Sequence, residues 1–271
     1  MRAIQSVLAQ VGVEVLVLVV ANGPQCDERL LEKISVLSGV QLLRMAAPSM
    51  PLALEFGRDH VKTPFFGELD DDDVYLEGGL RRLLDALLTD TDADVVVANC
   101  IIRRDGGNDV RRILDIQSVR NNPLDALMNS TWLGPGGALF RSDSVPSQVF
   151  SQIPKYLEWT GLGVILCLNH RLMFVDDPVS IHYQGLAHSV DESRDARIGR
   201  AKSLARILAF SLPLHIRRCL RVKLGATLHA CAMQHIADGD LADAWRCHIK
   251  SLFCPRGWRY ITFTRYLFLL R

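Results

Sequence analysis

Blocks of apolar residues alternate with amphipathic segments along the first third of the chain. Residues 14–20 are almost continuously apolar, as in a strand buried on both faces, and shorter apolar runs cover residues 41–45 and 65–69. Between these runs, residues 28–37 and 52–61 have the apolar spacing of helices. The alternation predicts an α/β fold with a mainly parallel sheet between helices. Ligands of such sheets bind at the carboxyl ends of the strands.

The middle of the chain has the signals of antiparallel pairing. Residues 94–104 form an apolar strand, and a Gly-rich turn separates it from residues 110–117, which we expect to return as its hairpin partner. Residues 132–141 form a glycine-rich loop that enters another strand, and two further short strands are expected at residues 171–175 and 179–183. The sheet is therefore expected to be mixed.

The last part of the chain is expected to be helical and basic, with breaks at Pro213 and near residues 237–240. Residues 197–271 contain 14 Lys and Arg against 3 Asp and Glu, whereas the preceding residues contain 17 against 27. Such asymmetry suggests that the basic part meets an anionic surface, either membrane lipid or nucleic acid. We expect a catalytic domain at residues 1–210 and a basic amphipathic helical tail at residues 211–271.

Arginine and aromatic residues are interleaved at the end of this tail, over residues 255–268. Trp, Tyr and Arg side chains together suit the headgroup region of a membrane, so the pattern favours peripheral membrane contact rather than a nucleic-acid partner. The alternative is a helical hairpin that packs on the catalytic domain.

Composition narrows the class of protein. With 271 residues, 49% of them hydrophobic, and a net charge of +1, the chain is long and apolar enough for one large core and is not a disordered protein. Seven widely spaced cysteines without a CxxC pair indicate reduced thiols, and a zinc site is not expected. No apolar run reaches the length of a membrane span, and the start has no signal-peptide pattern, so we expect a cytoplasmic protein.

Four consecutive aspartates, residues 70–73, close the strand at residues 65–69. Four adjacent carboxylates raise one another's pKa and weaken the fold locally unless a cation neutralises them. Mg²⁺ or Mn²⁺ is the simplest compensation, because these ions take oxygen ligands and keep open positions for phosphates. The alternatives are a solvated loop, or acids that favour the N-terminus of a helix expected at residues 76–88. The position at a strand end favours a metal and diphosphate site.

Other candidates carry weaker signals. Gly136 and Gly137 would let the backbone approach a ligand, although glycines equally mark an ordinary turn. Glu158 begins a helix that is expected to run to about Asn169, and a lone Glu there is commonly a partner of the helix dipole. Asn22 lies in the turn that ends the first apolar strand, again at a strand end.

The order of these features resembles the inverting family 2 glycosyltransferases with the GT-A fold, from residue 2 to about residue 210. In that family an Asp-x-Asp motif holds a divalent metal on the diphosphate of a nucleotide sugar. The resemblance implies that Asp70 and Asp72 are metal ligands with Asp73 beside them. It also places Asp70 and Asp71 at the nucleotide sugar.

The same resemblance assigns roles to the weaker candidates. Asn22 matches a position near the nucleotide, and Gly136 and Gly137 belong to a small-residue strand entrance that lines the donor. Glu158 stands where the family has a Glu-Asp pair whose Asp is the general base, but Trp159 replaces the second acid. Glu158 is therefore the candidate base.

The chain departs from the family at its front, because the apolar strand that is central in the family's sheet is absent. Loss of a central strand would leave its neighbours with unpaired backbone edges, so we expect that the sequence is shortened there. The resemblance implies a metal-dependent, inverting hexosyltransferase that uses a nucleotide-diphosphate sugar in the synthesis of surface polysaccharide or glycolipid. A glycan or lipid-linked acceptor would lie at the inner face of the plasma membrane. The alternatives are a catalytically impaired binding or scaffold protein at the membrane surface, and a metal-dependent nucleotidyltransferase.

Overall fold

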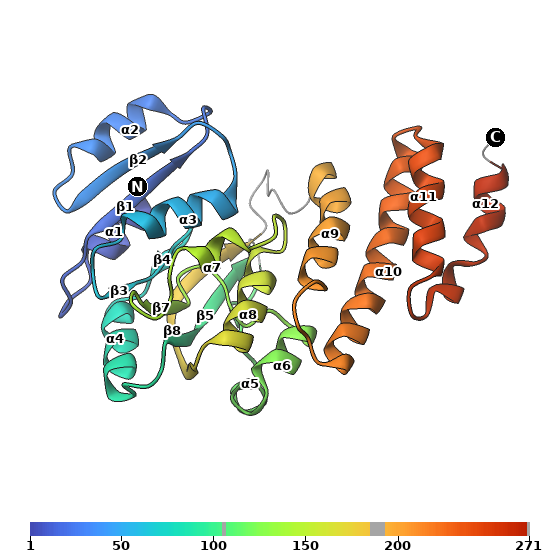
Figure 1. Cartoon of the computed structure of the whole chain (residues 1–271). Coiled ribbons are helices and arrows are strands. Elements are labelled where there is room, and N and C mark those ends of the chain that lie inside the picture. Colours follow the sequence, from blue (N-terminus) through green and yellow to red (C-terminus); the bar gives the residue numbers. More distant parts are fainter. Residues whose placement is uncertain (105–106, 185–192, 270–271) are drawn as a thin grey trace. The chain divides into compact units, whose positions relative to one another are not determined.

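The computed structural model describes residues 1–104, 107–184 and 193–269. The chain divides into two compact units, of which the first comprises Met1–Ile153 and Glu158–Leu186 and the second comprises Pro154–Leu157 and Ala187–Arg271 (Figure 1). All strands described belong to the first unit, and the described part of the second is helical. The acidic run thus lies in the unit that contains the sheets.

The first two strands of the chain form a small parallel sheet of their own. β1 (Val17–Asn22) pairs with β2 (Val40–Met45), and α2 (Glu28–Ser35) connects them. Helices α1 (Arg2–Leu8) and α3 (Met50–His60) both contact β1. A core of buried apolar residues holds α1 and α2 on the strands, namely Ile4, Ala21, Leu31 and Ile34. The apolar runs that predict these strands are therefore explained by a local core.

The other strands form a six-stranded mixed sheet around β5 (Val95–Arg104). β5 pairs in parallel with β8 (Leu172–Gln184) and antiparallel with β7 (Ala138–Arg141), and β7 pairs with β3 (Phe65–Phe66). At the other end of the strand order, β4 (Val74–Tyr75) pairs with β8. Among the described strands, the two parallel pairings, β1 with β2 and β5 with β8, have the longest registers. The predicted α/β class with a mainly parallel, mixed sheet is confirmed.

The expected continuous sheet is split into two. Among the described strands, β1 is hydrogen-bonded to β2 alone and β3 to β7 alone, so each has one edge without a described partner strand. Every open sheet has end strands of this kind, so the loss of a central strand stays a prediction.

Three strand predictions are wrong in their extent. The strand expected at residues 65–69 is limited to β3, so Gly67, Glu68 and Leu69 separate it from the acidic run. The return strand expected at residues 110–117 is limited to β6 (Val110–Arg111), and α5 (Ile116–Asn121) follows, because the Asp115 side chain accepts the N–H of Ser118 and caps that helix. α6 (Pro123–Asn129) comes next.

The two short strands expected at residues 171–175 and 179–183 are one strand, β8. The Asp-Asp-Pro sequence between them has the composition of a turn, yet it lies inside the strand. The register of β5 against β8 shifts on both sides of Asn99, which pairs with Pro178, so the irregularity accommodates the proline.

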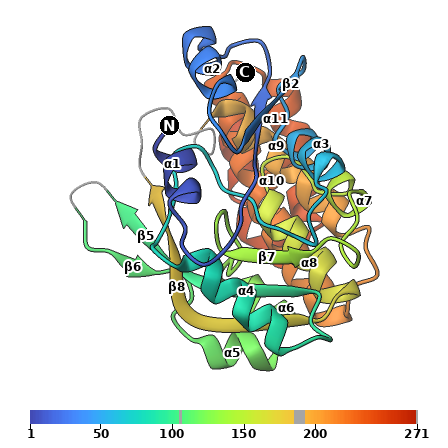
Figure 2. The ribbon, with the colours of Figure 1, turned by 90° about the vertical axis from the view of Figure 1, so that its left-hand side faces the viewer.

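Helices cover the six-stranded sheet in the first unit. α4 (Gly79–Thr89) packs against β5, β7 and β8 through Leu83 and Leu87, which are almost completely buried (Figures 1 and 2). α8 (Glu158–Asn169) packs against α6 and α7 (Gln148–Ser151). The predicted helix that begins at Glu158 is confirmed.

The described part of the second unit contains the helices that the C-terminal pattern predicts. They are α9 (Arg194–Ile207), α10 (Leu214–Ala237), α11 (Leu241–Leu252), the 3-10 helix η2 (Gly257–Tyr260) and α12 (Phe263–Leu269). The breaks at Pro213 and before Leu241 occur as expected. None of the described helices is long and apolar enough to cross a bilayer.

Candidate active site

The acidic run connects two strands that lie at opposite ends of the sheet's strand order, β3 and β4. Between them, the carbonyl of Glu68 accepts the N–H of Gly136 at 2.8 Å, and a reverse turn brings the N–H of Asp73 to 3.2 Å from the carbonyl of Asp70. β4 then pairs with Ser180 and Ile181 of β8. The run is therefore fixed at several backbone positions and is not a free surface loop.

Three carboxylates of the run converge. One oxygen each from Asp70, Asp72 and Asp73 lies within 4.8 Å of the others. Asp73 is fully buried, and both of its oxygens are held by β8: Oδ1 accepts the backbone N–H of Tyr183 at 2.9 Å, and Oδ2 lies 2.8 Å from Nδ1 of His182. Asp71, by contrast, is exposed. The structure thus groups the three aspartates predicted as metal ligands and leaves Asp71 outside that group.

The electrostatics of the run are those of acids without a counter-ion. Burial, and then the charges of Asp73 and Asp72, raise the pKa of Asp70 to about 7. Burial and the neighbouring aspartates also raise the pKa of Asp72. The pKa of Glu68 is raised well above its usual range, by burial first and then by Asp70 and Asp73. At Asp70 and Asp72 the neighbouring carboxylates raise the pKa as predicted, and burial is the largest single cause.

The alternative role as partners of a helix dipole is wrong. α4 begins at Gly79, its first turn contains no acidic residue, and Gly78 in a left-handed conformation precedes it. The run is separated from the helix by β4 and a short turn. The helix that follows therefore does not explain why four acids are adjacent.

The glycine turn before β7 packs on Leu69, the residue that precedes the acidic run. Gly136 has φ +64°, and a Cβ there would lie 2.7 Å from Cδ1 of Leu69 and 3.1 Å from Cβ of Ser180. The carbonyl of Gly137 accepts the N–H of Ala98 in β5 at 2.8 Å. Only glycine fits at residue 136, because the chain adopts positive φ and touches two neighbours. Gly136 therefore lies beside the residue that precedes the acidic run, whereas the contacts described for Gly137 are with Gly134 and with Ala98 of β5.

The other two predicted residues lie elsewhere in the first unit. Asn22 ends β1, and its Oδ1 accepts the N–H of Ser49 at 2.8 Å, which anchors the start of α3. Glu158 is the first residue of α8, and Trp159 follows it. The hydrogen bonds described for the run join it to α1, the glycine turn and β8, so a role for Asn22 or Glu158 in the same site stays a prediction.

The sequence pattern did not identify the residues that contact the acidic run from distant parts of the sequence. His182 and Tyr183 belong to β8, and Arg2 of α1 donates from Nη2 to the carbonyl of Asp72 at 2.6 Å. The Arg2 guanidinium also lies 4.1 Å from the centre of the Tyr183 ring. A lone histidine at a strand end carries no metal-ligand spacing, so nothing in the sequence singled out His182.

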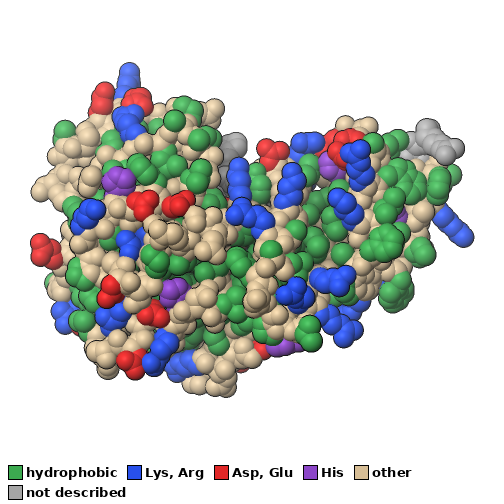
Figure 3. All heavy atoms as spheres, viewed as in Figure 1, with side chains coloured by type: hydrophobic (Ala, Val, Ile, Leu, Met, Phe, Trp, Pro, Cys, Tyr) green, Lys and Arg blue, Asp and Glu red, His purple; other side chains and the backbone are tan. Residues whose placement is uncertain are grey.

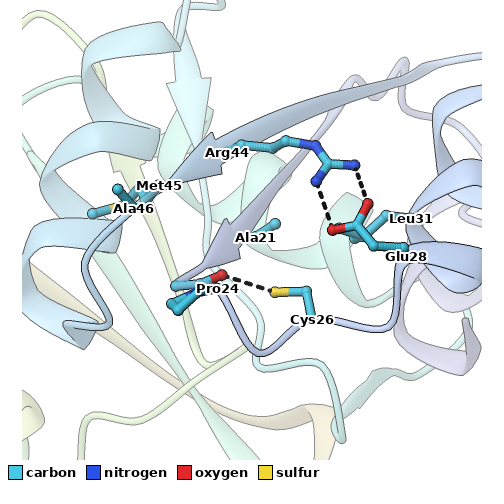
Figure 4. Close-up of a pocket in the computed structure, with 9 residues that line it drawn as sticks. Ala21, Pro24, Cys26, Glu28, Leu31, Arg44, Met45 and Ala46 are labelled. Carbon is cyan, nitrogen blue, oxygen red and sulfur yellow. Dashed lines mark hydrogen bonds and ion pairs between the residues drawn. The ribbon is translucent and has the colours of Figure 1, made fainter.

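A shallow pocket of about 350 Å³ opens at the carboxyl ends of β1 and β2 (Figure 4). Gly23, Pro24 and Cys26 line it, together with Arg44, which forms two hydrogen bonds to the Glu28 carboxylate at 2.8 and 2.9 Å. The acidic run contributes no residue to this pocket.

No protein-family model matches the sequence, and no curated protein matches it. Solved structures do share its fold. The structure of S. aureus TarS 1-349 in complex with UDP-GlcNAc has a TM-score of 0.59 at 11% identity, and the match covers 93% of this chain and 86% of that chain. Mannosyltransferase PcManGT from Pyrobaculum calidifontis, in complex with GDP-Man and Mn²⁺, has a TM-score of 0.51 at 16% identity, over 98% of this chain and 80% of that chain. The chain therefore has a GT-A-like fold, which it shares with glycosyltransferases.

Proposed function

We propose that this protein transfers a sugar from a nucleotide-diphosphate sugar to an acceptor hydroxyl, in a metal-dependent reaction that inverts the anomeric carbon. The observation that carries the proposal is the convergence of Asp70, Asp72 and Asp73 in a GT-A-like fold. The ligands of the similar structures, UDP-GlcNAc in one and GDP-Man with Mn²⁺ in the other, support a donor of this class. A family 2, hexosyltransferase type remains part of the proposal.

The donor set of the run fits Mg²⁺ or Mn²⁺. The three carboxylates supply oxygen ligands, which both ions prefer, and burial together with the charges of Asp73 and Asp72 raises the pKa of Asp70. Asp70 and Asp72 would hold the ion, with Asp73 fixed beside them by His182. When bound, the ion neutralises the charge that develops on the departing diphosphate.

The other residues of the chain orient the substrates. Gly136 and Gly137 would line the donor, Asp71 is exposed to solvent, and Asn22 would contact the nucleotide. Glu158 would accept the proton of the acceptor hydroxyl on the face of the sugar opposite the diphosphate, which gives inversion. These four assignments rest on the family resemblance.

A donor screen tests the proposal. The full chain is mixed with a panel of UDP-, GDP- and dTDP-sugars with and without Mn²⁺, and binding and sugar release are measured. We expect Mn²⁺-dependent binding of at least one donor, and about 100- to 1,000-fold slower turnover in Asp72→Asn. Asp143→Asn, which changes an exposed aspartate after β7, is the matched control and should behave like wild type. Equal turnover in Asp72→Asn and wild type would defeat the metal-dependent mechanism.

One observation favours a second candidate, a binding or scaffold protein without activity. Trp159 occupies the position where the resembled family has the second acid of its pair. On this reading a nucleotide sugar binds with Mn²⁺ but is neither hydrolysed nor transferred in the screen. A metal-dependent nucleotidyltransferase would instead release pyrophosphate from a nucleoside triphosphate, and no phosphate-binding P-loop pattern supports it.

We further propose that the second unit contacts the inner face of the plasma membrane, where a lipid-linked or glycan acceptor is found. Phe253, Trp258 and Ile261 are mostly exposed, and Arg256 and Arg259 lie between them in the sequence. On the face shown in Figure 3, hydrophobic and Lys or Arg side chains are intermixed over this unit.

Co-sedimentation with anionic phospholipid vesicles should fall about fivefold in the double variant Phe253→Ser, Trp258→Ser. It should not fall in Val36→Ser, an equally exposed apolar residue of the first unit. Equal sedimentation of all variants would contradict the contact.

A further inference from the structure

The turn between α10 and α11 holds a second group of potential metal ligands. His235 lies in the last turn of α10, Asp240 is the N-cap of α11, and Asp243 lies in the first turn of α11. One ligand atom from each of these residues lies within 4.8 Å of the other two. All three belong to the second unit, whereas the acidic run belongs to the first.

The backbone of the turn fixes His235 beside Asp240. The N–H of Asp240 donates to the carbonyl of His235 at 2.8 Å, and Gly239, at φ +78°, lets the chain reverse between the two helices. Oδ1 of Asp240 accepts the N–H of Asp243 at 3.0 Å. The other oxygen, Oδ2, faces the imidazole and lies 3.8 Å from Nδ1 of His235.

Nδ1 of His235 is buried without a hydrogen-bond partner among the described residues, in a residue that is only 8% exposed. A separation of 3.8 Å from Asp240 is too long for a hydrogen bond. Two ligands of a tetrahedral metal ion, with bonds of about 2.0–2.2 Å, lie about 3.3–3.6 Å apart, so a small side-chain movement brings these two atoms to the distance of a shared ion. The spacing therefore fits a bridging ion better than a direct contact, and an ion would satisfy a nitrogen that is otherwise costly to bury.

The ion pair between Arg246 and Asp243 uses one oxygen of that carboxylate and leaves the other available to such an ion. Arg246 donates from Nη1 to Oδ1 of Asp243 at 2.6 Å, which leaves Oδ2 of this half-exposed carboxylate. Asp238, in the same turn, is already paired with Arg194 and Gln234 and does not belong to the cluster.

We propose that His235, Asp240 and Asp243 bind a divalent transition-metal ion that ties the end of α10 to the start of α11. One imidazole nitrogen and two carboxylate oxygens suit ions of the Zn²⁺ or Co²⁺ type better than Mg²⁺. Three protein ligands leave further positions to water. The ion stabilises the helical hairpin and takes no part in sugar transfer, so this site is independent of the proposed function.

Co²⁺ is the probe, because its absorption spectrum distinguishes nitrogen and oxygen ligands from the cysteine thiolates of this chain. The full chain carrying Asp70→Asn and Asp72→Asn, which disable the acidic run, is titrated with Co²⁺ and followed by absorption, calorimetry and thermal unfolding. We expect one bound equivalent without a thiolate charge-transfer band, and a rise of several degrees in Tm at saturation. His235→Gln and Asp243→Asn in this background should each abolish both effects. Asp238→Asn is the matched control and should retain them.

Three outcomes would overturn the proposal: no bound Co²⁺ in the acidic-run variant, a thiolate band that assigns the ion to cysteines such as Cys231 and Cys247, or unchanged binding in Asp243→Asn. Because His235 is buried, its substitution could unfold the hairpin, and circular dichroism of the metal-free variants checks this. Asp243 is partly exposed, so its variant keeps the test decisive if His235→Gln does not fold.

Discussion

The two units of this protein each contain a cluster of three potential metal ligands, and the clusters are built in opposite ways. In the acidic run, fully buried Asp73 is held from β8, and the pKa of Asp70 is raised to about 7. In the helix turn, the buried residue is His235, and the pKa of Asp243 is lowered, chiefly by its hydrogen bond to Arg246. In the first cluster the carboxylates raise the pKa of Asp70, whereas in the second Asp243 has a positively charged partner, Arg246.

This difference separates two uses of a cation. At the acidic run, an ion relieves repulsion between buried carboxylates, so its binding is coupled to their protonation. At the helix turn, an ion would join side chains of which Asp243 already has a cationic partner, Arg246, so its main effect is on the stability of the hairpin. The predictions below test whether the two clusters respond separately.

The largest expected effect is on the pH dependence of Mn²⁺ binding to the acidic run. Because Asp70 must lose its proton to act as a ligand, and its pKa is about 7, affinity should rise about 20-fold between pH 5.5 and 7.5. Above pH 8 it should level off. The charged groups around Asp70 are Asp71, Asp72, Asp73 and His182. Calorimetry in two buffers of different ionisation enthalpy measures the affinity and the proton released.

The measurement is made in the variant Asp243→Asn, so that the helix-turn cluster does not contribute. An affinity that stays constant from pH 5.5 to 7.5 would show that Asp70 is not a ligand.

A smaller effect is expected from His182, the residue that sequence reasoning missed. His182 touches Oδ2 of Asp73 and not the other carboxylates described, so we assign it the positioning of that aspartate. His182→Gln should weaken Mn²⁺ binding about tenfold, as for other residues that orient a metal ligand. His60→Gln, whose ring bonds the carbonyl of Phe56 on the same helix, is the matched control. Wild-type affinity in His182→Gln would exclude the positioning role.

The sequence predicts the acidic run but not its supports, for a physical reason. Aspartates that are adjacent in the sequence repel one another whatever the fold, so residues 70–73 alone indicate the need for a cation. The contact of Asp73 with His182 spans 109 residues and exists only because β4 pairs with β8. Strand order is a property of the whole sheet, and no local pattern carries it.

The same reasoning explains which strands were predicted well. β1, β2 and β5 are apolar runs that meet a buried core, and the pattern alone identifies them. The predicted length of the hairpin partner of β5 was too great, because the side chain of Asp115 caps a helix at this point. Inside β8, Asp176, Asp177 and Pro178 have turn composition, and only the register shift opposite Asn99 shows that they lie in a strand.

The smallest effect expected is on the stability of the metal-free protein. The folded-state pKa of Asp70 lies above its unfolded value, so the folded state binds this proton more tightly, and wild type loses stability as pH rises from about 4 through 7. Asp70→Asn removes that loss. We expect the variant to be about 1 kcal/mol more stable than wild type in urea at pH 7.5 with EDTA, and equal to it near pH 4. Saturating Mn²⁺ should reverse the order, because only wild type gains from binding.

Asp243→Asn should move stability in the other direction, since the pKa of Asp243 is lowered by a favourable partner. A variant Asp70→Asn that is less stable than wild type at pH 7.5 without metal would mean that the acidic run is not a site of unrelieved charge.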